Sequence, residues 1–313
     1  MKYVLGIDSG GTKYLVRAQD LQGRDLARLV GPPACHHGME PAQMMLRIND
    51  NLDACLARFG GAREDCMSMV CGISGIDLPQ DQLIVDETYQ SLEGFSCPLL
   101  CVNDAVVAHY AVTGGVGALV ISGTGSVASG RDASGNETRC GGWPPVVFGD
   151  DGSGTWIGCK ALHLLTLLFD KRIKPSSFTD RLMAELGIRR GEDLIDICIE
   201  IEQMRWSDPG LSALVDEEAQ AGDAYALDIL RQAAGCTAAL ADAVIANLRL
   251  YEAPSFLVGA WGSAIAKSKI HFAFFKELLL QKYPNAEILV SEKDAATGAC
   301  AMALRRVVKN EQA

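Results

Sequence analysis

The sequence predicts an α/β protein built from two related halves. Each half contains a Gly-rich turn between two short apolar strands, at residues 8–13 and 123–126. Each turn is followed by a third strand and later by a helix with apolar side chains at helical spacing. The two halves have little sequence identity. Their shared order of elements nevertheless indicates two copies of one structural unit.

The first half begins with strands at 3–7, 14–18 and 25–30, joined by tight turns into an antiparallel meander. A helix at 41–59 follows. The next elements are a buried strand that ends at Ser74-Gly75, a helix, a strand that stops at Asn103-Asp104, and a helix beginning at Ala105. Their predicted ranges are 66–73, 81–92, 98–102 and 105–112.

The second half repeats the three strands and then becomes mostly helical. Its strands are predicted at 117–121, 127–131 and 137–140, followed by a helix at 155–169. Further helices are predicted at 178–186, 191–201, 211–221 and 224–248. The chain then has a strand at 255–258, a turn at 259–263, helices from 264 and at 272–283, a strand at 288–290 and an Ala-rich closing helix at 294–308.

Composition excludes several classes of function. The net charge of −11 makes a nucleic-acid backbone an unfavourable partner. The N-terminus becomes polar too early for a secretory signal, and we expect none of the apolar runs to be long enough to cross a bilayer. We therefore expect a cytoplasmic protein. Eleven scattered cysteines without a Cys-x-x-Cys spacing predict reduced thiols rather than disulfides or structural zinc. The pair His36-His37 is a poor metal candidate and is expected at the loop surface.

The polar residues at the strand ends predict phosphate chemistry. Gly-rich turns let backbone N–H groups surround an anion, and hydroxyl groups of Thr and Ser add donors. A carboxylate at the end of the first strand, Asp8, can hold Mg²⁺ through water. A carboxylate at the mouth of another strand, Asp104, can accept a proton from an attacking hydroxyl, although it can also serve only as a helix N-cap.

These motifs together resemble the acetate and sugar kinase, heat-shock chaperone and actin superfamily. The stretch from Gly6 to Lys13 resembles its first phosphate motif, residues 121–126 resemble the second, and residues 257–264 resemble the adenosine motif. Residues 140–143 and 149–154 are similar to the N-acetylglucosamine kinase branch of the BadF/BadG/BcrA/BcrD ATPase family. The motifs extend from the first strand to Gly298.

The resemblance implies two ribonuclease-H-like (actin-like ATPase) domains with an interdomain cleft. The first domain would span 1–113, completed by the C-terminal helix at 294–313, and carry the sugar. The second would span 114–293, with a helical insertion, and carry the nucleotide. The implied cofactors are ATP and Mg²⁺, and the implied partner is an amino sugar. The apolar helical stretch 224–250 suggests a homodimer.

The resemblance also implies a role for each site residue. Asp104 would be the catalytic base and Asp8 would organise the metal. The predicted ATP-binding residues are Gly10, Gly11, Thr12, Lys13, Thr124, Gly125, Ser126, Gly259 and Ser263. The predicted sugar-binding residues are Asn103, Asp104, Gly142, Asp150 and Cys35. Lys13 can equally be a solvated surface residue, Asp150 or Asp151 can simply favour a helix N-terminus, and Trp143 and Trp261 are expected to be packing residues.

Two departures from the family pattern concern the sugar. Cys35 stands where N-acetylglucosamine kinases have an Asn, and Pro144-Pro145 replaces a Gly-His segment. The predicted activity is phosphorylation of an amino-sugar hydroxyl, with N-acetylglucosamine to its 6-phosphate as the first choice and glucosamine as an alternative. An ATPase activator that carries an iron–sulfur cluster, for which Cys140 and Cys159 are the nearest candidates, and a non-catalytic sugar sensor also remain open.

Overall fold

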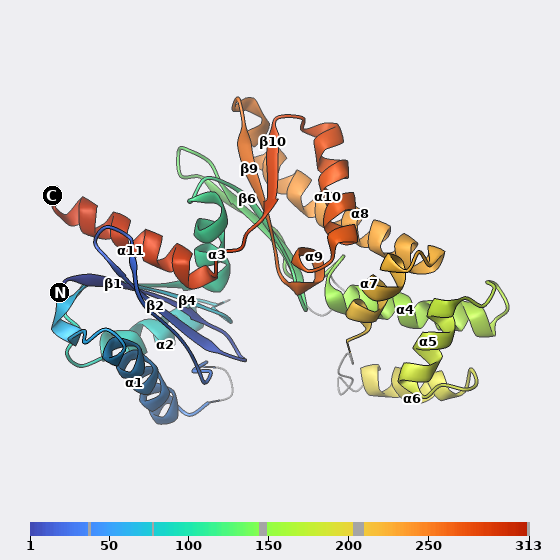
Figure 1. The fold of residues 1–313 in the computed structure, drawn as a ribbon, viewed down its shortest axis with the longest axis horizontal. Helices are drawn as coiled ribbons and strands as arrows, with labels where there is room; N and C mark the ends of the chain where they lie inside the picture. The colour runs from blue at the N-terminus through green and yellow to red at the C-terminus, as the bar shows by residue number, and fades with distance from the viewer. Residues whose placement is uncertain (37–38, 77, 144–148, 203–209, 312–313) are drawn as a thin grey trace. The chain divides into compact units, whose positions relative to one another are not determined.

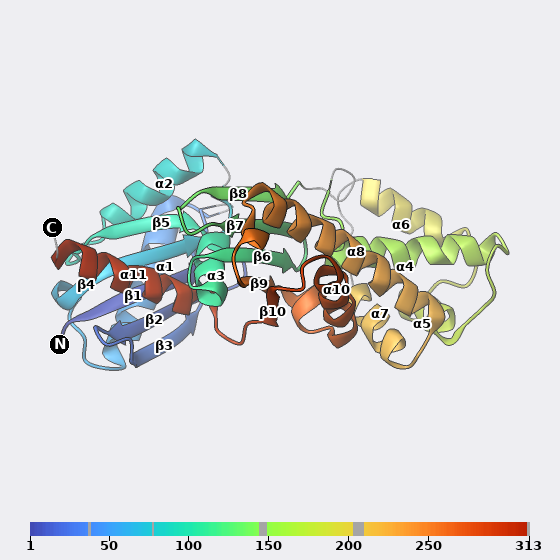
Figure 2. The same ribbon diagram turned by 90° about the horizontal axis from the view of Figure 1, so that it is seen from above.

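The computed structural model describes residues 1–36, 39–76, 78–143, 149–202 and 210–311. The chain divides into two compact units, shown in Figures 1 and 2. Unit 1 consists of Met1–Val116 together with Ser291–Ala313, and unit 2 consists of Gly117–Val290. Each unit contains one five-stranded sheet, so that each has a core of its own.

The sheet of unit 1 has the strand order β3-β2-β1-β4-β5. The first three strands form the predicted antiparallel meander, and β4 and β5 add parallel to β1. The strands are β1 (Tyr3–Ser9), β2 (Tyr14–Asp20), β3 (Asp25–Gly31), β4 (Cys66–Ile73) and β5 (Leu99–Asn103). The carboxyl ends of β1, β4 and β5 therefore meet at one edge of the sheet, where ligands commonly bind in open α/β sheets.

Helices cover both faces of this sheet. Side chains alternate between the faces of a strand, so Leu5 and Ile7 share one face and Gly6 lies on the other. Leu5 and Ile7 belong to the core formed with α1 (Pro41–Ala57) and α2 (Pro79–Gln90). The opposite face is covered by α11 (Ala295–Glu311), which packs on α3 (Asp104–Thr113), β1 and β4, as Figure 1 shows.

Glycine makes the close packing of α11 possible. A Cβ placed on Gly6 would lie 2.5 Å from the backbone nitrogen of Cys300, so only glycine lets the helix lie directly on β1. At the start of α11, the carboxylate of Asp294 accepts hydrogen bonds from Arg17 on β2 and Arg28 on β3, at 2.8 Å and 2.9 Å. The last helix of the chain is thus fastened to three of the first strands.

The sheet of unit 2 has the order β10-β9-β6-β7-β8. Its strands are β6 (Gly117–Ser122), β7 (Ser126–Arg131), β8 (Glu137–Gly141), β9 (Phe256–Trp261) and β10 (Ala286–Val290). A meander of β6, β7 and β8 is again extended by two parallel strands on the other side of its first strand. This connectivity matches that of unit 1 strand for strand, and the prediction of two related halves is confirmed.

The helices of unit 2 begin and end within a few residues of the predicted positions. A cluster of apolar side chains from α4, α5, α7 and α8 forms a second core beside that of the sheet. The helices are α4 (Gly154–Phe169), α5 (Ser177–Leu186), α6 (Asp193–Glu202), α7 (Leu211–Gln220), α8 (Ala224–Asn247), α9 (Ser263–Ala266) and α10 (Lys269–Lys282). Short 3-10 turns at Arg63–Asp65 and Leu250–Glu252 were not predicted.

Helix α8 contradicts the expectation that no apolar run is long enough to cross a bilayer. Among the described residues it is long and apolar enough to cross a membrane by length and composition alone. Core helices of water-soluble proteins pass the same test, and half of its apolar window is buried within the fold. Its buried residues, such as Ala234, Ala241 and Val244, belong to the core that includes the strands of the unit 2 sheet. The apolar composition of α8 is thus explained in part by packing within unit 2, and the homodimer stays a prediction.

A buried histidine makes unit 2 sensitive to acid. The side chain of His271 is fully buried, with Nδ1 3.1 Å from the carbonyl oxygen of Ala264 and Nε2 3.3 Å from Oγ1 of Thr237. Burial lowers the pKa of His271 to about 4, against an ordinary value of 6.5. Between pH 6.5 and 4, His271 therefore binds a proton in the unfolded chain and not in the folded chain. The free energy of unfolding decreases as the pH falls through this range.

We expect this histidine to cost on the order of 2–3 kcal/mol of unfolding free energy at pH 4 relative to pH 7. Urea unfolding at several pH values, compared between the wild type and His271→Gln, measures the effect. The variant should be less stable at pH 7 but should lose less stability between pH 6.5 and 4.5. Carboxylates that titrate in the same range are common to both proteins and cancel. Parallel pH profiles would contradict the assignment.

Candidate active site

In unit 1, two carboxylates lie at the edge where the parallel strands end. Asp8 is the penultimate residue of β1 and is level with Gly72 of β4. Asn103, the last residue of β5, is level with Ile73 of β4, and Asp104 follows it directly. The register of β1, β4 and β5 thus brings Asp8 and Asp104 to the same edge, with one strand between them.

The turn after Asp8 is open and tightly hydrogen-bonded. The N–H of Gly10 donates to the carbonyl of Lys13 at 3.0 Å, which closes the turn. A Cβ placed on Gly11 would meet no atom within 4 Å, so a ligand can approach the backbone there. Thr12 and Lys13 are exposed beside it. Lys13 Nζ lies 3.8 Å from Oδ2 of Asp8, with half of the Lys13 side chain (51%) in solvent.

The carboxylate of Asp8 lies in an environment that disfavours its charged form. Its side chain is only 16% exposed, and burial raises the pKa of Asp8 to about 6. The positive charge of Lys13 opposes this rise in pKa, whereas the negative charge of Asp104 adds to it. Asp8 and Asp104 are therefore close enough for their charges to interact, and a bound cation would relieve their repulsion.

Asn103, and not Asp104, is the N-cap of α3. The side-chain oxygen of Asn103 accepts a hydrogen bond from the N–H of Ala105 at 3.0 Å, and its amide nitrogen donates to the carbonyl of Ile76 at 3.2 Å. Asp104 is the first residue of the helix. Asn103 thus fixes the start of α3 and the position of Asp104, whereas the resemblance implied a contact of Asn103 with the sugar.

The loop after β3 lies beside the same edge. Ser9 Oγ donates to the carbonyl of Ala34 at 3.1 Å, and the next residue, Cys35, is buried. The expectation that His36 lies at the surface is wrong: its side chain is 3% exposed, with Nε2 3.2 Å from the Gly75 carbonyl and 3.6 Å from Oδ1 of Asp81. The histidine connects this loop to the segment that follows β4. His37 lies outside the described residues.

In unit 2, the central Gly-rich turn connects β6 and β7 as predicted. Ser122 is paired with Ser126 at the ends of these strands, and the N–H of Gly123 donates to the carbonyl of Gly125 at 2.9 Å. Thr124 is exposed at the tip of the turn. The geometry leaves the tip open to a ligand while the base of the turn is fixed by the sheet.

Residues 150–155 hold this turn from one side, and we call them the clasp segment. Oδ1 of Asp150 accepts a hydrogen bond from the N–H of Ser126 at 2.9 Å. Ser126 Oγ donates to the carbonyl of Asp151 at 2.8 Å, and Thr155 Oγ1 donates to the carbonyl of Thr124 at 2.8 Å. Helix α4 begins inside the clasp segment, with Ser153 as its N-cap. These contacts order both ends of the turn.

Asp150 adopts a backbone conformation that non-glycine residues rarely use, with φ of +58°. The carboxylate fills the space beside Gly125, since a Cβ on that glycine would lie 2.7 Å from Oδ1 of Asp150. Gly142 is next to the same turn, because its N–H donates to the carbonyl of Ser126 at 2.8 Å. Asp150 and Gly142 therefore contact the predicted phosphate turn directly, which their spacing in the sequence did not reveal.

The predictions for Trp143, Trp261 and Pro144-Pro145 have different outcomes. Trp143 was expected to be a packing residue, yet 69% of its side chain is exposed. Trp261 is partly buried at the end of β9, as a packing residue would be. Pro144-Pro145 lies outside the described residues.

The predicted adenosine turn begins three residues later than expected. Gly259 is a buried residue in the middle of β9, paired with Leu119 on one side and Leu289 on the other. The turn is made by Gly262, with φ of +93°, and Ser263 follows as the exposed first residue of α9. A Cβ on Gly262 would lie 2.9 Å from the nitrogen of Gly123, so Gly262 is needed for the close approach to the central turn.

The structure thus groups the predicted residues into two sets, one in each unit. Asp8, the turn 10–13, Asn103, Asp104 and the loop with Cys35 form the set of unit 1. The turn 123–126, Gly142, Asp150 and Ser263 form the set of unit 2, to which Gly262 is added. Gly259 is placed in the sheet below them. Among the described residues, no group of three or more His, Cys, Asp or Glu side chains could hold a metal ion.

A comparison with protein families agrees with this geometry. The model of the BadF/BadG/BcrA/BcrD ATPase family matches residues 5–303. The chain belongs to this family. An N-acetyl-D-glucosamine kinase of Dictyostelium discoideum is 32% identical over 310 residues, which cover 96% of this chain and 97% of that protein. An N-acetylmuramic acid/N-acetylglucosamine kinase of Clostridium acetobutylicum is 29% identical over 307 residues, which cover 97% and 98%.

Solved structures show the same fold in this BadF/BadG/BcrA/BcrD family member. A candidate N-acetylglucosamine kinase from Chromobacterium violaceum has a TM-score of 0.73 at 23% identity, over 97% of this chain and 99% of that one. A ROK family glucokinase from Streptomyces griseus, solved with glucose and AMPPNP, has a TM-score of 0.60 at 17% identity, over 96% and 98%. The predicted fold class of two ribonuclease-H-like units is confirmed by these likenesses and by the matching sheets.

Proposed function

We propose that the protein is an ATP-dependent kinase that phosphorylates a hydroxyl of an amino sugar, with N-acetylglucosamine and its 6-hydroxyl as the preferred acceptor. The observation that carries the proposal is the pair Asp8 and Asp104, whose charges interact at one edge of the unit 1 sheet. Membership of an ATPase family supports the use of ATP, and two relatives of nearly the same length that are named N-acetylglucosamine kinases support the acceptor.

We propose that Asp104 is the general base. As the first residue of α3, it lies at the edge where β1, β4 and β5 end, and a carboxylate there can accept a proton from the sugar hydroxyl. Asn103 fixes the start of the helix and thereby the position of Asp104. The hydroxyl oxygen would attack the terminal phosphorus of ATP, so that positioning and charge stabilisation supply most of the catalysis.

We propose that the Gly-rich turns bind phosphate groups of ATP. In unit 1 these are residues 10–13, and in unit 2 they are Thr124, Gly125 and Ser126. Gly262 and Ser263 extend the second set toward the nucleoside. The open backbone at Gly11 and the exposed tip at Thr124 support this assignment, because neither is blocked by side chains.

Asp8 is the residue proposed for Mg²⁺. The donor set fits this ion, since Mg²⁺ is commonly bound by one or two carboxylates together with water and substrate phosphates. The raised pKa of Asp8 and the nearby charge of Asp104 fit a site that is completed by a cation. When bound, the ion would neutralise charge on the phosphate oxygens.

In unit 1, Asp104 and the loop with Cys35 are proposed for sugar binding. In unit 2, Gly142 and the second carboxylate oxygen of Asp150 are proposed for sugar binding. Asn103 belongs to this set only through its hold on Asp104, because its own amide is bonded to Ile76 and Ala105. Cys35 offers a small buried thiol where relatives of the resembled branch have an amide. We therefore expect recognition of the acetamido group to depend less on Cys35 than on the other contacts.

A coupled ADP-release assay over a panel of sugars tests the proposal. The panel is N-acetylglucosamine, glucosamine, N-acetylmuramic acid, N-acetylmannosamine and glucose, each with ATP and Mg²⁺. We expect the highest kcat/KM for N-acetylglucosamine, and we expect mass spectrometry and NMR of the product to show a 6-phosphate. ADP release that no sugar increases, or a brown preparation that contains iron, would contradict the kinase and favour an ATPase activator.

The hydrogen bond from Ser126 to Asp150 leads to a prediction about nucleotide binding. Asp150→Ala removes the acceptor for a backbone N–H at the base of the central turn. Loss of one hydrogen bond to a charged group costs about 1.5–3 kcal/mol, so we expect the Kd for nucleotide to rise at least about tenfold. Titration calorimetry with a non-hydrolysable ATP analogue measures it. Asp151→Ala is the control, because Asp151 accepts from Ser126 through its backbone carbonyl, which the substitution retains.

A further inference from the structure

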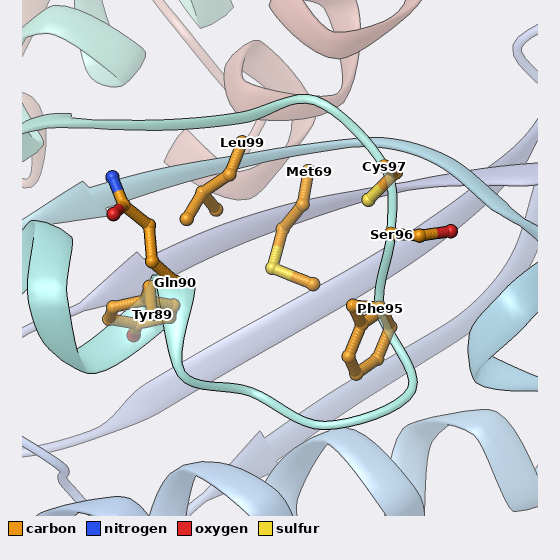
Figure 3. Close-up of a pocket in the computed structure, with 7 residues that line it drawn as sticks. All are labelled: Met69, Tyr89, Gln90, Phe95, Ser96, Cys97 and Leu99. Carbon is orange, nitrogen blue, oxygen red and sulfur yellow. The ribbon is translucent and has the colours of Figure 1, made fainter.

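A pocket in unit 1 lies apart from the candidate active site, between β4, α2 and the segment that leads to β5 (Figure 3). Its volume is about 180 Å³, and both polar and apolar side chains line it. Phe95, Ser96 and Cys97 come from the segment between α2 and β5, whereas Met69 comes from β4. Cys97 lines this pocket, and the residue is neither fully buried nor fully exposed.

A second thiol lies next to Cys97. The Sγ atoms of Cys97 and Cys66 are 3.5 Å apart, although the residues are 31 positions apart in the chain. Cys66 is the first residue of β4 and is buried. The backbone on both sides is held in register, since the N–H of Met69 donates to the carbonyl of Pro98 at 3.0 Å. The sulfur atoms need to approach by about 1.5 Å to reach the S–S bond length of about 2.05 Å.

The environment divides the two thiols into an attacking and a resolving partner. A hydrogen bond with Cys66 holds the pKa of Cys97 below its usual range, against the opposing effect of burial. The same contact, together with burial, raises the pKa of Cys66 far above its usual range. A pocket-lining thiol with a lowered pKa next to a buried thiol is the arrangement found in redox-sensitive pairs.

Another pair of cysteines in the same sheet shows what this pair adds. Cys71 and Cys101 are level with each other on β4 and β5, and their thiols also interact. Both are buried, and neither lines the pocket. Burial raises the pKa of Cys71 well above its usual range. The two pairs therefore differ in access and in thiolate character, and they form a matched comparison within one protein.

We propose that Cys97 and Cys66 form a reversible disulfide when the protein meets a peroxide. The Cys97 thiolate attacks one peroxide oxygen, the O–O bond breaks, and an S–O bond forms to give a sulfenic acid. The hydroxide that leaves takes up the proton released by the Cys97 thiol and becomes water. The Cys66 sulfur then attacks the Cys97 sulfur, the S–O bond breaks, and the leaving hydroxide takes the Cys66 proton. Two thiols and one peroxide thus give one disulfide and two waters.

The position of this disulfide predicts its effect. Cys66 is the first residue of β4 and Cys97 lies just before β5, whereas Asn103 and Asp104 are at the carboxyl end of β5. A bond there would close a loop that contains all of α2 and would constrain the unfolded chain more than the active-site edge. The disulfide therefore stabilises unit 1 and leaves the catalytic residues in place.

The full-length reduced protein is treated with hydrogen peroxide, its remaining thiols are blocked with N-ethylmaleimide, and its digest is examined by mass spectrometry. We expect a peptide pair that joins Cys66 to Cys97, a rise in the melting temperature of several degrees, and return to the starting state with dithiothreitol. The ADP-release activity should change less than twofold. Peptides from Cys71 and Cys101 should remain alkylated.

Four variants make the test decisive. Cys97→Ser and Cys97→Ala should abolish the disulfide and the rise in melting temperature, whereas Cys101→Ser should leave both unchanged. Cys66→Ser should stop the reaction at a Cys97 sulfenic acid, which dimedone labels. Oxidation of the exposed Cys198 while Cys66 and Cys97 stay alkylated would overturn the proposal. Oxidation of Cys71 with Cys101 at an equal rate would also overturn it, as would a peroxide-dependent loss of activity that requires Cys97.

Discussion

Asp104→Asn is expected to lower kcat by about 10³-fold or more while nucleotide and sugar still bind. General base catalysis contributes about 10²–10⁴-fold to a reaction, and an amide of the same shape cannot accept the proton. The fold should not change, because the cap of α3 is Asn103 and its hydrogen bond to Ala105 does not involve the Asp104 side chain. Turnover is measured by ADP release, and binding is measured by titration calorimetry with a non-hydrolysable analogue.

The matched control is Asp50→Asn, which makes the same change in charge and shape on the exposed surface of α1 in the same unit. This variant should keep kcat within about twofold, since surface substitutions rarely have large effects. If Asp104→Asn retained near-normal turnover, Asp104 would not be the base. If both variants lost turnover equally, the cause would be the overall charge of unit 1. The comparison therefore separates a chemical role of Asp104 from an electrostatic one.

The elements of the fold could be predicted because their signals are local. Glycine-rich turns flanked by apolar strands fix a hairpin wherever they occur, and both hairpins are present at Ser9–Tyr14 and Ser122–Ser126. Helices α7 and α8 begin at the predicted residues because their apolar spacing, and for α8 the N-cap Asp223, are encoded within one or two turns. The end of β9 was misplaced because Gly259 was read as a turn residue, whereas a buried strand tolerates a glycine.

The arrangement of the site could be predicted only in part. The strand ends that carry Asp8 and Asn103-Asp104 were recognisable, since polar residues follow apolar runs there. The hydrogen bond between Asp150 and Ser126 joins residues 24 positions apart and has no local signal. The burial of His36 depends in the same way on Gly75 and Asp81, which come from a different segment. Such contacts follow from tertiary packing, which one sequence does not encode in its periodicity.

Gly298→Ala is expected to be one of the most destabilising small substitutions in unit 1. A Cβ at this position of α11 would lie 2.5 Å from the nitrogen of Ala111 and 3.0 Å from its Cα, and still closer to the carbonyl oxygen of Val107. All three atoms belong to the backbone of α3, so no side-chain rotation can make room and the helices must separate. The loss should be about 2–4 kcal/mol of unfolding free energy, even though alanine is the better helix former by about 1 kcal/mol.

The control is the same substitution where space is open. Gly235 is an exposed residue in the middle of α8, and a Cβ there would meet no atom within 4 Å. Gly235→Ala should stabilise unit 2 by about 0.5–1 kcal/mol, because only the propensity term remains. Urea unfolding of both variants should therefore give shifts of opposite sign. A neutral Gly298→Ala would mean that α11 does not pack on α3 at this distance.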